Sequence, residues 1–276
     1  MKVNKETKEG ILDKFKQDNS GKFAKWNPVC KRFVAFLDIM GFKDFVARNS
    51  HEKIAVEMLK VDNHIKEISK SNGLISSDSI IVTTFSDSII IFSKDESIPS
   101  YIDFCSVVGK LFCKIIGDSL PVKGGIAYGD ITVNQSRQIY FGQPIIDAYL
   151  LEEEVNYYGI AVHNSVEEYR RKFSTDEIPL VTILDKLVEF KTPLKSGNIE
   201  HYNLCWFDYA LNEVYKDGRE KKIAVAKRIL NGIVNRYKIS VSGNPRRYID
   251  NTKDVIDLYI KELPRLEKYR KQHNLN

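Results

Sequence analysis

Two aspartates lie at the ends of strongly apolar segments of this chain. Asp38 follows the apolar run 33–37, and Asp87 lies in a Ser-Asp-Ser turn between the apolar runs 80–85 and 89–92. A carboxylate beside a buried strand costs free energy unless a cation or a hydrogen-bond donor pairs with it. Two such carboxylates on neighbouring strand ends can hold divalent cations against a phosphate chain. We therefore interpret the pair as a candidate metal site, at which bound divalent ions would take part in the processing of a nucleotide.

Each aspartate, taken alone, has an ordinary structural explanation. Asp38 could be the N-cap of a helix that follows a strand, which is a common position for Asp. Asp87 could be an acid in an ordinary turn. Only their occurrence together, with a Gly-Phe loop after Asp38, favours the metal site.

The composition is that of an ordinary globular protein with one large domain, or one domain and an appendage. The 276 residues are 43% hydrophobic and 29% charged, with a net charge of +5. This mildly positive charge suits an anionic small ligand. The basic residues between 219 and 228 are interleaved with a helical apolar stripe, so we interpret them as a solvated face and expect no nucleic-acid partner.

The sequence carries no signal for export, for a membrane or for disulfides. Its charged N-terminal segment lacks the apolar core of a signal peptide, and no apolar stretch approaches the length that spans a bilayer. The four scattered cysteines form no C-x-x-C pair, which favours reduced thiols over zinc ligands or disulfides. We therefore expect a cytoplasmic protein without a membrane span.

The apolar patterns predict alternating strands and helices. We expect strands at 33–39, 79–85, 88–92, 121–128, 131–133 and 160–162, and helices at 54–68, 97–117, 143–154 and after 164. The second and third strands form a tight hairpin, and Gly129-Asp130 is a turn signal. This order is typical of an α+β protein with a ferredoxin-like, split βαβ layer.

We expect three regions along the chain. Residues 1–30 form a lead-in segment, residues 31–192 form the α+β domain, and residues 193–276 form a mostly helical region. The second boundary is placed in the segment 191–198, which has the composition of a loop. Apolar stripes at 223–237 and 255–266 predict helices beyond it.

Four blocks of sequence stand in a defined order. They are FLDIMGF at 36–42, FSDS at 85–88, GGIAYG at 124–129 and the segment 141–152, which begins with Phe-Gly. In order and spacing these blocks resemble the catalytic domain of class III nucleotide cyclases. The resemblance covers residues 31–162, and the D-I-x-G-F and S-D-S-I forms are most similar to the bacterial pyrimidine cyclases of Pycsar anti-phage defence.

The resemblance implies a homodimer with active sites shared across its interface. Asp38, Ile39 and Asp87 would hold two Mg²⁺ or Mn²⁺ ions per site. Backbone amides at the start of the following helix would cradle the phosphates of a nucleoside triphosphate. These amides belong to Ile39, Met40, Gly41 and Phe42. The product would be a 3′,5′-cyclic monophosphate, read by an effector that the cyclase does not bind directly.

The chain departs from the family where purine cyclases carry an Asn and an Arg on the helix after the Phe-Gly block. The matching residues are Ile146 and Leu150, and neither side chain can donate a hydrogen bond. Lys123 is the nearest basic substitute in a matched block, either as a catalytic cation or as a surface lysine at a strand end. Arg137 is a second candidate. Loss of such a cation would slow the reaction greatly, so a nucleotide-binding regulatory module without catalysis is the alternative.

Base selectivity in the family depends on two positions, which here are Thr83 and Ile139. Adenylate cyclases use Lys and Asp at these positions, and guanylate cyclases use Glu and Cys. Thr83 and Ile139 match neither set, and a bulky Ile argues against ATP. We expect a uridylate cyclase in preference to a cytidylate cyclase, because turnover of UTP is the commoner activity that the resemblance implies. An adenylate cyclase with altered base contacts is a third possibility.

Overall fold

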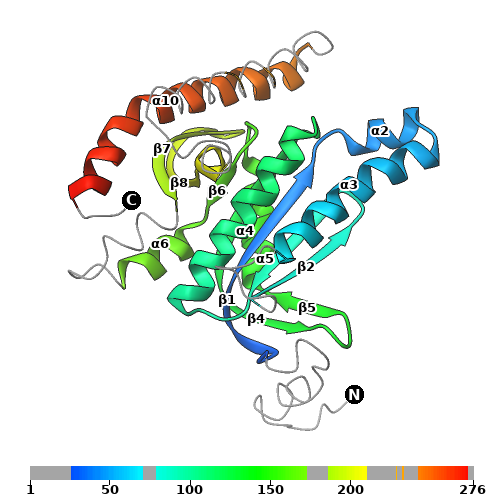
Figure 1. Ribbon diagram of the computed structural model, residues 1–276, viewed down its shortest axis with the longest axis horizontal. Helices are drawn as coiled ribbons and strands as arrows, with labels where there is room; N and C mark the ends of the chain where they lie inside the picture. The colour runs from blue at the N-terminus through cyan, green and yellow to red at the C-terminus, as the bar shows by residue number, and fades with distance from the viewer. Residues whose placement is uncertain are drawn as a thin grey trace.

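The computed structural model describes residues 26–70, 79–172, 186–209 and 242–272 together with the helical residues 228 and 232, and it describes the side chains of the last helix as far as Lys261. In this part of the chain, eight strands form one sheet and helices cover both of its faces (Figure 1). The protein is therefore a mixed α+β protein, as the sequence predicts.

The elements follow the expected order closely. The strands are β1 (Val29–Ile39), β2 (Ile80–Phe85), β3 (Ser88–Ser93), β4 (Val122–Asn134), β5 (Ile139–Gly142), β6 (Ile160–Val162), β7 (Leu187–Leu194) and β8 (Gly197–Leu204). The helices are α2 (Phe42–Arg48), α3 (His51–Lys70), α4 (Ile98–Gly117), α5 (Gln143–Glu154), α6 (Asn164–Arg171) and α10 (Asn244–Gln272). None of the described helices is long and apolar enough to cross a membrane.

The first four strands have the ferredoxin-like arrangement. The sheet runs in the order β2-β3-β1-β4-β6-β8-β7, and β1 is antiparallel to both β3 and β4. A split βαβ layer places its first strand in this way, between the third and the fourth. Because β1 is central, both of its faces are covered, which explains its unbroken apolar run. The predicted ferredoxin-like layer is confirmed.

The two faces of β1 pack against different layers. Phe33 and Leu37 belong to the main core together with residues of α3 and α4. Side chains alternate along a strand, so Phe36 and Asp38 point to the opposite face. There the ring of Phe36 lies 5.3 Å from the ring of Tyr149 on α5. Figure 1 shows α3 and α4 on one side of β1 and α5 on the other. Asp38 therefore belongs to the α5 layer.

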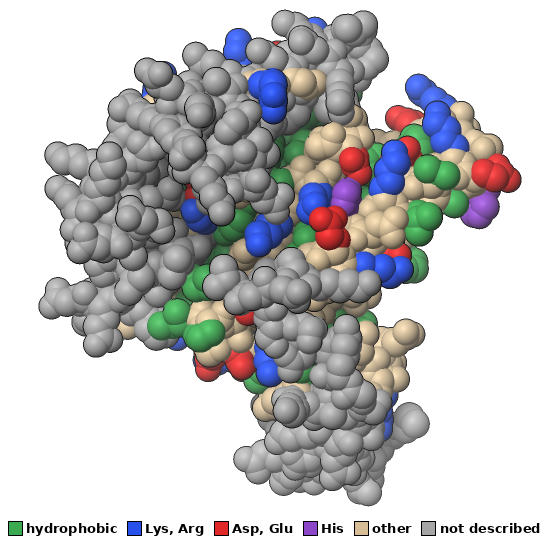
Figure 2. All heavy atoms as spheres, in the orientation of Figure 1, with side chains coloured by type: hydrophobic (Ala, Val, Ile, Leu, Met, Phe, Trp, Pro, Cys, Tyr) green, Lys and Arg blue, Asp and Glu red, His purple; other side chains and the backbone are tan. Residues whose placement is uncertain are grey.

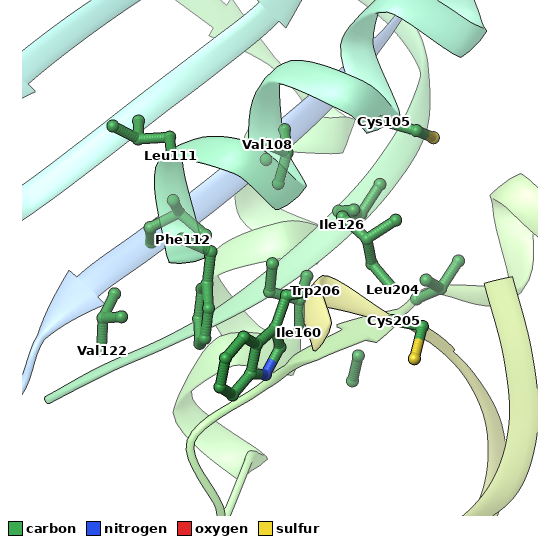
Figure 3. Packing of buried hydrophobic residues seen from close by; sticks show 14 of the residues in the cluster. Cys105, Val108, Leu111, Phe112, Val122, Ile126, Ile160, Leu204, Cys205 and Trp206 are labelled. Atoms are coloured by element: carbon green, nitrogen blue, oxygen red, sulfur yellow. The ribbon is translucent and has the colours of Figure 1, made fainter. Parts of the chain in front are cut away.

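The segment after β8 completes the main core. Trp206 is buried, and its ring centroid lies 5.3 Å from that of Phe112 on α4. The indole N–H of Trp206 donates to the carbonyl of Tyr158 at 3.2 Å. Figure 3 shows Trp206 beside Phe112, in the same packed group as Ile160. The chain beyond residue 193 thus contributes to the same core as the ferredoxin-like strands.

The two positions where the sequence predicts region boundaries both lie within strands. The one after residue 30 falls inside β1, which begins at Val29. The segment 191–198, expected to be a loop, contains the end of β7, the two-residue turn Lys195-Ser196 and the start of β8. Pro193 is tolerated because β7 is the last strand in the sheet order; on its outer edge the N–H of Asn156 donates to the Pro193 carbonyl at 2.9 Å, a bond that needs no N–H from the proline. The helix expected at 223–237 lies outside the described residues, apart from positions 228 and 232.

β4 is one strand where the sequence predicts two. Gly129 and Asp130, expected to form a turn, lie inside β4 and pair with Arg32 and Lys31 of β1. The other edge of β4 pairs with β6 and then with β5. The ladder to β1 runs through both residues and holds the strand extended there, so their turn propensity is overridden.

An end of the molecule formed by α2 and α3 projects from the sheet (Figure 1). α2 buries none of its residues. Figure 2 shows apolar side chains on this end, and Val46, Val56 and Leu59 are exposed there. Because α2 starts at Phe42, this surface adjoins the loop that follows Asp38.

Candidate metal and nucleotide site

Asp38 and Asp87 meet at one end of the sheet. Asp38 is the penultimate residue of β1, and Asp87 lies in the two-residue turn between β2 and β3. The backbone N–H of Ile39 donates to the carbonyl of Asp87 at 3.0 Å, and Asp38 pairs in register with Ser88. The hairpin turn is therefore docked against the end of β1, and the two aspartates lie on neighbouring strand ends.

The charges at this end of the sheet interact. The pKa of Asp38 is raised to about 6, mainly by burial and also by the charges of Asp87 and Glu153, while the charge of Lys123 acts to lower it. Like charges that are held close together favour either a shared proton or a bound cation. Asp38 and Asp87 are both half-buried, so each still has an accessible side. The arrangement can therefore accept a positively charged ligand.

The oxygen donors fit a divalent ion that shares its coordination with phosphates. Mg²⁺ is commonly held by one or two carboxylates together with substrate phosphates and water. The side chain of Ile39 is buried in the core, so only its backbone oxygen is available to a metal. In the part of the chain that the structure describes, no three His, Cys, Asp or Glu side chains are grouped to hold a metal. The remaining ligands would have to come from the nucleotide and from water.

The loop after Asp38 has fewer free amides than the sequence predicts. The Ile39 N–H is bound by the β2–β3 turn, and the Met40 N–H donates to the carbonyl of Pro121 at 2.8 Å. The expectation that these two amides cradle phosphates is wrong, because each already has a protein acceptor. Gly41 has a φ of 74°, a left-handed conformation that glycine adopts easily, and it turns the chain into α2. Its amide and that of Phe42 lie at the start of this helix.

Lys123 is buried against α5 and is only 5% exposed. Its ammonium donates to the carbonyls of Glu152 at 2.8 Å and Glu153 at 3.3 Å. It also lies 2.9 Å from Oε1 of Glu152, although that oxygen accepts no well-aligned hydrogen bond. Lys123 is paired with Asp38 in the β1–β4 register, and its positive charge lowers the pKa of Asp38. Its N–H groups are hydrogen-bonded to the carbonyls at the end of α5. These contacts contradict both the surface lysine and the cation that binds a phosphate directly.

Glu152 is a residue of this region that the sequence analysis missed. It is 2% exposed on α5, and its pKa is raised to about 7, mainly by burial and also by the charge of Asp38, against the lowering effect of Lys123. The helix can lie this close because β4 has Gly125 at the crossing, where a Cβ would be 2.3 Å from the carbonyl oxygen of Ala148. Glu152 follows Ala148 by four residues, so helical periodicity places both on the face toward the sheet. The four-residue spacing between Ala148 and Glu152 is the sequence signal that could have placed Glu152 on this buried face.

The other residues singled out in the sequence lie on β2, on β5, in the turn before β5 and on α5. Thr83 is half-buried on β2, and Ile139 is 38% exposed on β5. Arg137 lies in the exposed turn before β5 and is not among the charges that shift the pKa of Asp38. Ile146 and Leu150 project from α5 and are 52% and 55% exposed. Apolar side chains therefore occupy the two α5 positions where the family carries polar ones.

Comparison with solved structures finds bacterial adenylyl cyclases. A bacterial light-regulated adenylyl cyclase is 13% identical, with a TM-score of 0.43 over 64% of this chain and 91% of that chain. The adenylyl cyclase CyaB from P. aeruginosa is 16% identical, with a TM-score of 0.40 over 63% of this chain and 93% of that chain. No protein-family model matches the sequence, and no curated protein matches it.

Proposed function

We propose that this protein is a nucleotide cyclase, which converts a nucleoside triphosphate to its 3′,5′-cyclic monophosphate and pyrophosphate. The observation that carries the proposal is the adjacency of Asp38 and Asp87, whose segments are joined by the 3.0 Å hydrogen bond from Ile39 to Asp87. The four sequence blocks around them support it. The proposal includes two Mg²⁺ or Mn²⁺ ions per site, with Asp38, Asp87 and the backbone of Ile39 as protein ligands.

In the proposed reaction, the ribose 3′-oxygen bonds to the α-phosphorus while the bond from that phosphorus to the β-phosphate oxygen breaks. The bound ions would lower the pKa of the 3′-hydroxyl and stabilise charge on the phosphates. The protein holds the two carboxylates in place through the hairpin docked on β1. The charge of Lys123 lowers the pKa of Asp38, which favours the ionised form that a metal requires. The amides of Gly41 and Phe42 are the proposed backbone donors for the phosphate chain, since those of Ile39 and Met40 already have protein acceptors.

The proposal includes a homodimer in which α5 of one subunit faces the metal site of the other. α5 exposes Ile146, Tyr149 and Leu150, which form one apolar stripe at helical spacing. Phe85, beside the turn that carries Asp87, is 81% exposed. Exposed apolar surface of this kind is typical of protein interfaces. A second copy of the chain would cover both surfaces in one contact.

The proposed substrate is a pyrimidine nucleotide, with UTP preferred over CTP. Ile139 has no hydrogen-bonding side chain, so it cannot read the edge of a purine as an acid at that position would. The resemblance to Pycsar cyclases extends the proposal to a cytoplasmic second-messenger synthase in anti-phage defence. In that role the cyclic nucleotide, and not the cyclase, contacts the effector.

Identification of products by mass tests the proposal. The purified protein is incubated with Mn²⁺ and each of the four triphosphates, and we expect cyclic UMP and pyrophosphate from UTP. Asp38→Asn and Asp87→Asn should form no product with their folds intact, while the control Asp62→Asn, an exposed acid on α3, keeps activity. Absence of a cyclic product from every triphosphate would overturn the proposal.

A nucleotide-binding module without catalysis is the second candidate. Ile146 and Leu150 favour it, and so does the engagement of the Lys123 ammonium by α5. It predicts that a triphosphate raises the melting temperature and is recovered intact by chromatography. An adenylate cyclase with altered base contacts is a further variant, and parallel turnover of ATP and UTP separates it from the first proposal.

A further inference from the structure

Lys123 and Asp38, both in the described part of the chain, are cross-strand neighbours that form no ion pair with each other. They are directly paired in the β1–β4 register, so their side chains leave the same face of the sheet, with Cβ atoms about 5 Å apart. Opposite charges in this position attract each other. The ion pair of Lys123 is instead made with Glu152 on α5, at 2.9 Å. The ammonium is therefore directed toward α5 and away from the carboxylate of its neighbour.

Three oxygens at the end of α5 surround this ammonium. The carbonyls of Glu152 and Glu153 accept its hydrogen bonds at 2.8 and 3.3 Å, and Oε1 of Glu152 lies 2.9 Å from it. The last carbonyls of a helix carry only partial negative charge, whereas an ionised carboxylate carries a full one. Of the three oxygens, Oε1 of Glu152 therefore competes most strongly with Asp38 for the ammonium.

The packing of α5 on β4 fixes the position of Glu152. Gly125 permits the close approach, because a Cβ there would lie 2.3 Å from the carbonyl oxygen of Ala148, one turn before Glu152. Glu152 and Lys123 are both buried, so water screens their attraction less than it would at the surface. Apolar residues of similar volume often stabilise a fold as well as a buried ion pair does. Stability alone therefore gives no reason for charges at these two positions.

We propose that Glu152 is a positioning residue of the candidate site, which holds the Lys123 ammonium off Asp38 and so keeps the Asp38 carboxylate open to a divalent ion. The inference rests on the proposed function, since it requires metal ions at Asp38 and Asp87. An ammonium bound directly to Asp38 would occupy oxygens that the metal needs and would repel the metal charge. Held on α5, the same ammonium still lowers the pKa of Asp38 without occupying its oxygens.

Glu152→Gln tests this role, because glutamine keeps the shape of the side chain and removes its charge. The measurement is the affinity for inorganic triphosphate with Mn²⁺, by calorimetry at pH 8.5, above the Glu152 pKa of about 7. We expect Glu152→Gln to weaken binding about tenfold, the factor that a hydrogen bond between charged groups is worth, because the released ammonium turns to Asp38. Lys123→Met/Glu152→Gln removes the competing ammonium and should restore the wild-type affinity.

A second buried ion pair, between Lys186 and Asp208, supplies the matched control. Asp208 is 1% exposed and lies on the segment after β8, outside the candidate site. Asp208→Asn should lower the melting temperature, as Glu152→Gln does, and should leave the triphosphate affinity unchanged. If Glu152→Gln does not fold, Glu152→Asp takes its place, because the shorter side chain draws the carboxylate back from the ammonium. It should weaken binding by a smaller factor, which Lys123→Met again removes.

The outcomes separate this inference from the proposed function. If the wild type binds triphosphate with Mn²⁺ and the Glu152 variant binds it equally well, the role of Glu152 is overturned while the metal site stands. Weakening that Lys123→Met does not reverse, or equal weakening by Asp208→Asn, would assign Glu152 a packing role and would also overturn the inference. If the wild type binds no triphosphate, the proposed function and this inference are both overturned.

Discussion

Replacement of Lys123 by methionine tests whether its ammonium stabilises the end of α5. Lys123 is 5% exposed, and it donates to two carbonyls of α5 and faces the carboxylate of Glu152. Methionine keeps the unbranched stem of the side chain, one atom shorter, and removes the charge and the donors. Glu152, which is 2% exposed, then has no cation beside it. Removal of one partner from a buried pair costs about 3–5 kcal/mol.

This cost must depend on pH, because Glu152 can take up a proton. Its pKa in the folded protein is about 7, above the ordinary value of 4.5. Between these pH values the folded state binds the proton more tightly than the unfolded state, so stability falls as the pH rises from 4.5 to about 7. Lys123 lowers the pKa of Glu152, so its removal raises that pKa and extends the fall to higher pH. At pH 5, where Glu152 is protonated in the fold, the loss is limited to the two hydrogen bonds, about 1–3 kcal/mol.

Urea unfolding at pH 5 and at pH 8.5 is the assay. Lys123→Met should lose clearly more stability at the higher pH, approaching the full cost of about 3–5 kcal/mol for a broken buried pair. The double variant Lys123→Met/Glu152→Leu removes both charges and should recover most of that loss. Equal losses at the two pH values, or a double variant as unstable as the single one, would refute the reasoning.

Two further substitutions test α5, one its packing and the other its exposed face. Gly125→Ala would place a Cβ 2.3 Å from the carbonyl oxygen of Ala148, so it should lower stability by about 1–3 kcal/mol in thermal unfolding. Gly117→Ala, where a Cβ meets nothing within 4 Å, is the control and should cost nothing; equal effects would contradict the close approach of α5. Leu150→Glu adds a charge to a side chain that is 55% exposed, so it should dissociate the proposed homodimer in sedimentation without lowering monomer stability. A dimer that persists in this variant would exclude that part of α5 from the interface.

Elements with local signals could be predicted from the sequence. The ends of α5 agree with the expected range 143–154, because Pro144 suits the first turn of a helix. The β2–β3 hairpin was found because two apolar runs flank the short turn Ser86-Asp87. Asp38 and Asp87 could be selected for the same reason, since each interrupts or ends an apolar run. Their adjacency then follows from the ferredoxin-like order of the strands.

Features that depend on distant partners could not be predicted. The β7–β8 hairpin contains Pro193, and only the sheet order reveals that β7 is an edge strand where proline is tolerated. Lys123 and Glu152 are 29 residues apart, and no local pattern indicates that they meet.

The central claim is that the carboxylates of Asp38 and Asp87 together hold divalent ions against a triphosphate. The most direct measurement is the anomalous scattering of Mn²⁺ in crystals grown with a non-reactive triphosphate analogue. We expect Mn²⁺ peaks between the two carboxylates and the phosphate oxygens, and their loss in Asp87→Asn. Analogue bound elsewhere on the protein, or Mn²⁺ peaks that avoid both aspartates, would contradict the account.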